Sequence, residues 1–286
     1  MNRYGLDLGT MALWLAFSQT VSAQVLPNAA SGSGISKPAF GATSEATANS
    51  QLPSIRQPGP DTADLPDSPY AVPPGVVYAE TSFTYFRIRT PAAHDYTTAT
   101  LIRIGLVENW ELRLSSPGLI VRDGLPDSTT GFGPVTIGAK WHWWDEIQEQ
   151  GIPGAGLIFQ VTTRTGSDAF RPEIAEPASF LTFSHSLPWE MEFEWNLGLS
   201  LTKEESERTQ LQGWLLWAVS KELTPNLNLF VHGYILTPGF ITDTEIVLGP
   251  GFIWFISERM ALDASSVFGV TDDSPTIARV GWSLAF

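Results

Sequence analysis

The stretch from Thr276 to Phe286 alternates side chains with a period of two, and this alternation constrains the fold most. One face carries Thr276, Ala278, Val280, Trp282, Leu284 and Phe286, and the other carries Arg279, Gly281 and Ser283. Successive side chains of a β-strand point to opposite sides of the sheet, so the pattern predicts a strand. An apolar outer face with a polar inner face is what a barrel wall needs when lipid lies outside and a polar lumen inside.

The same alternation recurs throughout residues 76–286 in segments divided by turn signals. It predicts an all-β fold: a single antiparallel transmembrane β-barrel of about twelve strands. A tilted strand needs about 9–11 residues to cross a bilayer, and an even count returns both chain ends to one side. The predicted strands are 76–89, 98–107, 109–121, 132–144, 153–164, 177–187, 190–202, 209–222, 226–237, 243–256, 259–270 and 275–286.

Connection lengths also fit a membrane barrel. Connections 107–109, 187–190, 224–226 and 257–259 are short, whereas 122–130 and 164–177 are longer. Periplasmic turns are short and external loops longer in such barrels. The longer connection at 146–152 is the exception, and it leaves room for a miscounted strand.

The alternation assigns most charged side chains to the face opposite the aromatic ones. The predicted lumen-lining residues are Glu80, Arg103, Glu111, Arg113, Lys140, Gln160, Glu192, Glu194, Asp263 and Arg279. The predicted outward aromatic girdle at the membrane interfaces is Trp110, Trp141, Trp143, Trp195, Trp217, Trp254, Trp282 and Phe286. In segment 76–89, Phe86 falls on the face of Glu80, which predicts a bulge or register change there.

Composition narrows the function classes. The chain contains 11 Trp, no Cys and a formal net charge of −14. Amphipathic aromatics gather at bilayer interfaces, although a Trp-rich soluble β-protein is the alternative. The acidic balance and the lack of a basic run argue against nucleic-acid binding. No segment approaches the roughly 20 apolar residues of a spanning helix.

The N-terminal quarter differs from the rest of the chain. Residues 1–23 read as a signal peptide, with an apolar core at 11–17 and the small-residue site Val21-Ser22-Ala23; an interfacial anchor helix is the alternative. Residues 24–75 are rich in Pro, Ser and Ala, which predicts a disordered periplasmic tail because such a segment buries little apolar area. A plug folded into the lumen is the alternative.

Three motifs resemble one family of outer-membrane proteins. They are Leu101-Ile102-Arg103-Ile104-Gly105-Leu106 with Asn109-Trp110-Glu111-Leu112-Arg113-Leu114, then Gly131-Phe132-Gly133 leading to Gly138-Ala139-Lys140, and Thr163-Arg164-Thr165-Gly166-Ser167. In this order they are similar to the phenol-degradation meta-pathway (MetA-pathway) family of transporters. Pro134 stands where the family has an acidic residue, and Arg164 where it has a proline. The resemblance implies an outer-membrane channel for hydrophobic or aromatic compounds.

The inward charges are mixed in sign, which favours ion-paired filling of a narrow lumen over a one-sign selectivity ring. A constriction that orients a small solute is the alternative. The four histidines, His94, His142, His185 and His232, lie in no GxSxG or metal-ligand pattern, so no catalytic, cofactor or metal site is predicted.

The sequence therefore predicts an outer-membrane channel for small, apolar or aromatic molecules. The expected partners are outer-membrane lipid and lipopolysaccharide, the barrel-assembly machinery through the last strand, and the solute. Two alternatives stay open. A barrel enzyme acting on lipid would need a Ser or Thr oxygen near His142 or His232, and a non-transporting barrel would bind a partner through its loops.

Overall fold

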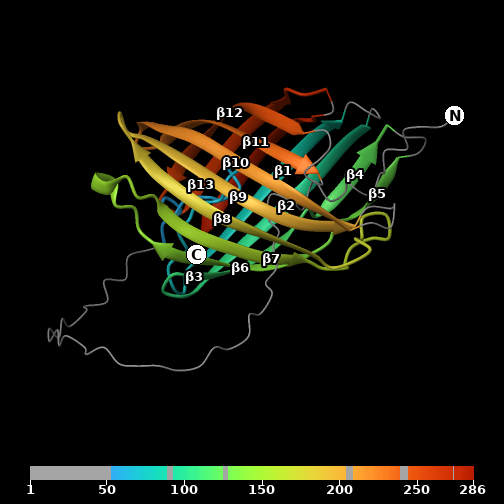
Figure 1. The fold of residues 1–286 in the computed structure, drawn as a ribbon, viewed down its shortest axis with the longest axis horizontal. Coiled ribbons are helices and arrows are strands. Elements are labelled where there is room, and N and C mark those ends of the chain that lie inside the picture. The colour runs from blue at the N-terminus through green and yellow to red at the C-terminus, as the bar shows by residue number, and fades with distance from the viewer. Residues whose placement is uncertain (1–52, 89–92, 125–127, 204–208, 239–243, 273) are drawn as a thin grey trace.

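One antiparallel sheet closes on itself to form a barrel (Figure 1). The computed structural model describes residues 53–88, 93–124, 128–203, 209–238, 244–272 and 274–286. Strand β1 (Val77–Ile88) pairs with β2 (Ala93–Val107) on one side and with β14 (Thr276–Ala285) on the other. The predicted barrel is confirmed, and the alternating residues 276–285 form its closing strand.

Fourteen strand segments build twelve wall strands, because two wall strands are each broken in the middle. Strand β2 pairs with both β3 and β4. On the other side, β4 pairs with β5 and β3 pairs with β6. The remaining bounds are β3 (Trp110–Ser116), β4 (Leu119–Asp123), β5 (Thr129–Phe132), β6 (Thr136–Trp144), β7 (Gly154–Thr162), β8 (Glu176–Leu187), β9 (Met191–Lys203), β10 (Thr209–Thr224), β11 (Leu227–Pro238), β12 (Glu245–Ser257) and β13 (Met260–Gly269).

The break between β3 and β4 reverses the inward face. Arg113 in β3 and Arg122 in β4 are both buried, although nine residues of strict alternation would place them on opposite faces. Gly118 lies between them with a φ of 63°, a left-handed conformation that suits glycine. This irregularity lets one wall strand carry an inward arginine in each half.

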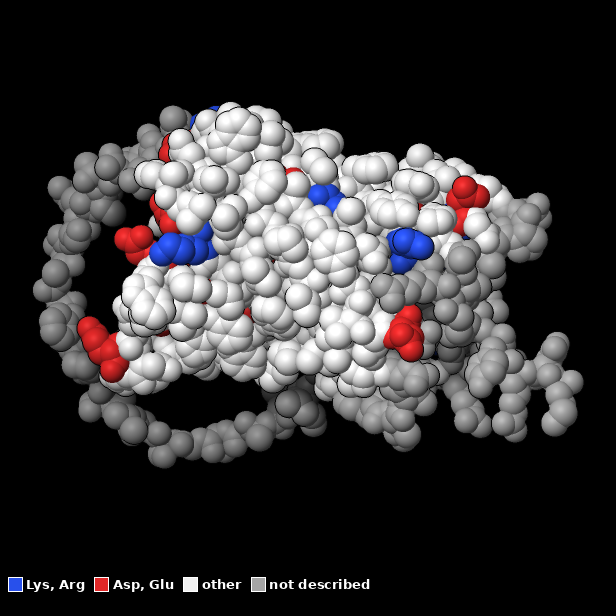
Figure 2. All heavy atoms as spheres, turned by 90° about the horizontal axis from the view of Figure 1, so that it is seen from above, with Lys and Arg blue, Asp and Glu red and all other residues white. Residues whose placement is uncertain are grey.

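The outer surface is mostly uncharged. In the face of Figure 2, Lys, Arg, Asp and Glu are sparse and lie mainly toward the two ends of the barrel. Of the predicted girdle, Trp141, Trp254, Trp282 and Phe286 are exposed, whereas Trp110, Trp143, Trp195 and Trp217 are half-buried. Neighbouring rings cover part of them, as where Trp110 stacks on Trp141 at 5.3 Å between ring centroids. Contact of these rings with a membrane interface stays a prediction.

Two local expectations are corrected by the structure. Strand β1 keeps a continuous register with both neighbours, so it carries no bulge. Phe86 shares the inner face with Glu80 because it packs against Ile120 and Phe170 near one mouth of the barrel. The connection between β6 and β7 hides no extra wall strand: it holds a 3-10 turn (Gln148–Gln150) and one bridge between Ile147 and Ile152.

In the described part of the chain, no helix is long and apolar enough to cross a membrane.

Residues 53–75 correct the prediction of a disordered tail. We call them the lumen segment, because they run inside the barrel (Figure 1) and bury Ile55, Ala63 and Val72 completely or almost completely. These three side chains form an apolar cluster with wall residues such as Tyr78 and Phe230. Apolar packing and buried ion pairs offset the entropy of ordering the segment. The predicted signal peptide and residues 24–52 lie outside the described residues.

Candidate functional site in the barrel lumen

The lumen segment begins at the end of the barrel that carries the short turns, which we call the turn end; the opposite end is the loop end. Arg56 binds two of these turns, with its Nε 2.9 Å from Glu258 Oε1 and its Nη2 2.8 Å from Asn226 Oδ1. The backbone N–H of Ile55 donates to the carbonyl of Glu258 at 2.7 Å. These contacts fix the start of the lumen segment at the rim.

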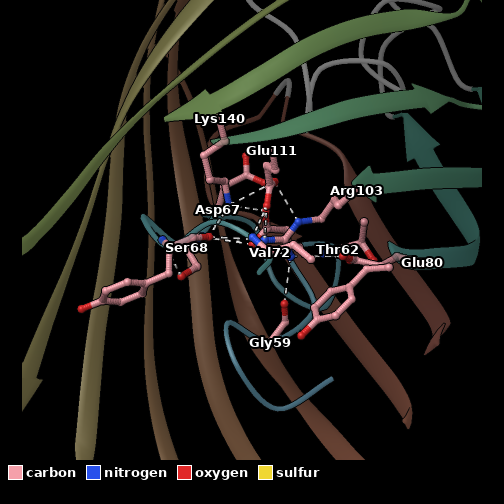
Figure 3. Close-up of polar contacts among 12 residues, drawn as sticks. Gly59, Thr62, Asp67, Ser68, Val72, Glu80, Arg103, Glu111 and Lys140 are labelled. Atoms are coloured by element: carbon pink, nitrogen blue, oxygen red, sulfur yellow. Dashed lines mark hydrogen bonds and ion pairs between the residues drawn. The ribbon is translucent and has the colours of Figure 1, made fainter. Parts of the chain in front are cut away.

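Deeper inside, three wall cations converge on one carboxylate of the lumen segment. Figure 3 labels two of these cations, Arg103 and Lys140, beside Asp67 and Glu111. Arg103 in β2, Arg113 in β3 and Lys140 in β6 are buried and point inward. Asp61 Oδ2 accepts from Lys140 Nζ at 2.5 Å and from Arg113, and Asp61 Oδ1 lies 3.2 Å from Arg103 Nη1. The cations predicted to line the lumen therefore bind the chain's own N-terminal segment.

Further contacts extend this cluster along the segment. Asp67 Oδ1 lies 2.6 Å from Arg113 Nη2, and Glu111 bridges Arg103 and Arg113 at 2.9 Å from each. Wall carboxylates also accept from the segment's backbone: Val72 N–H donates to Glu111 and Thr62 N–H donates to Glu80, both at 2.8 Å. We call the seven side chains Asp61, Asp67, Glu80, Arg103, Glu111, Arg113 and Lys140 the anchor cluster.

The anchor cluster holds one carboxylate more than it holds cations. Burial alone would raise the pKa of Asp61, but its three cationic neighbours outweigh burial and hold that pKa well below its ordinary value. Asp67 is paired with Arg113 only, so burial dominates and raises the pKa of Asp67 to about 7. Asp67 therefore keeps a proton at a higher pH than an aspartate in water does.

Gly105 allows the lumen segment to approach the wall. A Cβ at this position would lie 2.0 Å from the carbonyl oxygen of Pro73. The backbone groups meet instead, with Gly75 N–H donating to the Gly105 carbonyl at 2.9 Å. The glycine of the first family-like motif is thus explained by contact with the lumen segment.

The other predicted lumen residues also face inward, in different surroundings. Gln160 and Asp263 are buried, and Arg279 donates to Asp263 at 2.6 Å. Glu192 and Glu194 on β9 are half-buried. Ser184 donates to Glu192 at 2.6 Å, across the β8–β9 pair. None of these five contacts the cations of the anchor cluster through a recorded ion pair among the described residues.

An apolar cluster fills the lumen toward the loop end, and the sequence pattern missed it. Its buried members come from β7, β8, β10, β11, β12 and β13, and Leu65 of the lumen segment packs against them. They are Ile158, Ala178, Phe180, Trp214, Leu216, Tyr234, Leu236, Val247 and Val267. The signal was the unbroken apolar run 214–219, which indicates a strand that is apolar on both faces.

At the loop end, residues 163–175 fold over the inner wall. Phe170 is buried against Ile120, and the guanidinium of Arg122 lies 5.5 Å from its ring centroid. Arg122 also pairs with Asp95 at 2.7 Å across two wall strands. Ser167 fixes this connection to β5, where the Phe132 N–H donates to its hydroxyl at 2.8 Å. The second and third family-like motifs therefore meet in space.

The enzyme alternative required a hydroxyl near a histidine. His142 contacts the Pro69 carbonyl and Asp145, while both ring nitrogens of His232 lack a hydrogen-bond partner. Within the described ranges, no Ser or Thr oxygen is bonded to either ring. The described residues also contain no group of three or more His, Asp or Glu arranged to hold a metal ion.

One known family of proteins matches this chain in sequence. The model of the family described as "Putative MetA-pathway of phenol degradation" matches residues 60–279. The chain belongs to this family. The match includes most of the lumen segment as well as the barrel, so the resemblance inferred from the three motifs is confirmed. No curated protein is similar enough in sequence to match the chain.

Solved outer-membrane barrels share the fold. The COG4313 outer membrane channel from Pseudomonas putida F1 aligns with a TM-score of 0.58 at 10% identity, covering 79% of this chain and 99% of that one. The NanC porin gives a TM-score of 0.49 at 8% identity, covering 71% and 98%. The KdgM porin in complex with disordered oligogalacturonate gives 0.46 at 11%, covering 72% and 99%. At such identities the first alignment supports the fold alone.

Proposed function

We propose that this protein is an outer-membrane channel that passes small apolar molecules, aromatic ones included, by facilitated diffusion. The observation that carries the proposal is the apolar cluster inside the lumen. A water-filled porin exposes polar side chains along its whole passage. Here solute must pass Phe180, Trp214 and Leu236, which are buried against one another.

An apolar constriction separates solutes by their hydration. A hydrated ion or sugar loses water when it enters such a constriction and receives no hydrogen bonds in return. An aromatic hydrocarbon has little hydration to lose and gains contact with the ring and aliphatic surfaces. The lumen therefore favours apolar over polar solutes of equal size.

The proposed orientation places the turn end and the lumen segment at the periplasmic side. Short turns mark the periplasmic side of outer-membrane barrels, and the N-terminal residues enter the barrel at that end. The predicted partners, lipid, lipopolysaccharide and the barrel-assembly machinery, belong to this proposal.

Uptake by a deletion strain tests the proposed function. Cells complemented with the wild-type gene should take up radiolabelled toluene faster than uncomplemented cells. Leu216→Gln and Leu236→Gln place polar groups in the apolar cluster and should slow toluene uptake. Thr84→Gln is the control, because Thr84 is an inward residue of β1 outside the cluster. Equal toluene uptake with and without the protein would disprove the proposal.

A further inference from the structure

The lumen segment is attached to the two sides of the barrel very differently. All three cations of the anchor cluster, Arg103, Arg113 and Lys140, come from β2, β3 and β6. On the opposite side, contact with β9 runs through Asn196, whose side chain exchanges two hydrogen bonds with the backbone of Asp67 at 2.7 and 2.9 Å. The ion pairs of Asp61 and Asp67 thus hold this part of the segment against one half of the wall.

A cavity of about 590 Å³ lies on the other side, between the lumen segment and strands β9 to β12. Its segment side includes Asp64 and Tyr70, and its wall side includes Glu194, Asn228 and Phe230. This volume is within the usual range of small-molecule sites. The seated segment therefore leaves room for a solute beside it.

The ionisable side chains that line this cavity are mainly acidic. Glu192 and Glu194 project from β9, and Asp64 faces them from the lumen segment. Burial raises the pKa of Asp64 well above its ordinary value, with the neighbouring carboxylates adding to the effect. The Oδ1 atom of Asn228, another acceptor, is buried without a hydrogen-bond partner.

Arg56, the cationic side chain of the cavity lining, is already paired with rim residues. Arg56 binds Glu258 and Asn226 at the rim, and its guanidinium lies over the ring of Phe255 at 4.7 Å. Nearby Arg279 is held by Asp263 at 2.6 Å. The cavity thus presents aromatic surface and free acceptors, a combination that suits a positively charged group with an apolar body.

We propose that solute passes the seated lumen segment through this cavity, and that Asp64, Glu192 and Glu194 make the passage prefer apolar molecules carrying an ammonium group over apolar anions. The inference rests on the proposed function, of which it specifies the route and the preferred charge. The ion pairs of Asp61 and Asp67 lie on the other side of the cavity and Arg56 holds the start of the segment at the rim, so the lumen segment stays in place during passage. Ionised carboxylates in the lining attract a solute cation, whereas they repel an anion.

Two probes of similar size test the charge preference in liposomes that contain the purified full-length protein. Benzyltrimethylammonium and benzenesulfonate are permanently charged, so neither crosses lipid readily. The wild type should admit the cation about threefold to tenfold faster, the range expected for carboxylates in a partly hydrated lumen. Glu192→Gln with Glu194→Gln should remove this preference. Glu222→Gln, an exposed glutamate of β10 outside the cavity lining, is the matched control and should keep it.

The route is tested by locking the lumen segment in place. The chain has no cysteine, so Asp67→Cys with Asn196→Cys introduces a single pair of thiols for a short bifunctional maleimide, at a point where the Asn196 side chain contacts the backbone of residue 67. The untreated form of the same variant is its own control. Unchanged cation entry after crosslinking supports a route beside the seated segment, and entry blocked only in the crosslinked form overturns it.

The outcomes separate this inference from the proposed function. Equal entry of both probes, or a preference that survives the double glutamine substitution, overturns the charge preference while toluene uptake can still succeed. Entry of neither probe also overturns the inference. Failure of toluene uptake is the result that rejects the proposed function itself.

Discussion

Replacing Arg113 by methionine should release the lumen segment. Arg113 is buried and pairs with Asp61, Asp67 and Glu111 at once. The anchor cluster now contains three cations and four carboxylates, so loss of Arg113 raises the excess from one carboxylate to two. Methionine keeps most of the side-chain volume, which confines the change largely to charge and hydrogen bonding.

The magnitude follows from the burial of the cluster. Removing one partner of a buried ion pair costs about 3–5 kcal/mol, because a charge is left buried without compensation. Each 1.4 kcal/mol is a factor of ten in an equilibrium constant, so the ratio of displaced to seated segment should rise by at least about a hundredfold. Protonation of the carboxylates absorbs part of this cost at low pH.

Thiol labelling measures the displacement. Ala71→Cys places a single thiol in the lumen segment of a chain that has no other cysteine. A bulky maleimide should label this thiol much faster in the Arg113→Met background than in the wild-type background. Adding Asp67→Asn returns the excess to one carboxylate and should restore part of the protection.

Arg122→Met is the control for this experiment. Arg122 is also a buried arginine, but its ion pair joins two wall strands near the loop end and does not involve the lumen segment. The control should leave labelling of the Cys at position 71 unchanged. Equal labelling in wild type and Arg113→Met would refute the argument that the ion pairs hold the segment in the lumen.

Three further predictions concern neighbouring contacts. Gly105→Val should expose the lumen segment to maleimide labelling, since even a Cβ would lie 2.0 Å from the Pro73 carbonyl; unchanged labelling would contradict the packing argument. Burial raises the pKa of Asp67 to about 7, so its stabilisation of the seated segment is complete below about pH 4 and is lost as the pH rises through 7; once the base-catalysed intrinsic rate is divided out, the amides of the segment should therefore be less protected from hydrogen exchange at pH 8 than at pH 5, and Asp67→Asn should flatten this difference. Phe170→Ala removes a buried ring that anchors residues 163–175, at a cost of about 3–5 kcal/mol, and trypsin should then cut faster after the exposed Arg164; an unchanged cleavage rate would show that the ring is dispensable.

The sequence by itself determined the wall of this barrel. A charged side chain facing lipid costs several kcal/mol, so the wall strands keep their charged residues on the inner face. Where the inner face is polar, the sequence alternates with a period of two. Residues 276–286 show it, and Glu111, Arg113 and Lys140 fall on the inner face as the pattern predicts. The departure at Phe86 was read as a bulge, because the pattern does not tell an inward apolar residue from a shifted register.

Only the tertiary structure decided what fills the barrel. Residues 53–75 have no periodicity, since they form no regular element, and their order depends on ion pairs with residues far along the chain, 79 positions away for Asp61 and Lys140 and 202 for Arg56 and Glu258. The aspartates at 61 and 67, which pair with inward cations, were a signal that composition alone obscured. The inward apolar cluster was likewise hidden, because strands that are apolar on both faces show no alternation. Local sequence records which side of the wall a residue faces, whereas the contents of the lumen depend on contacts that form when the sheet closes.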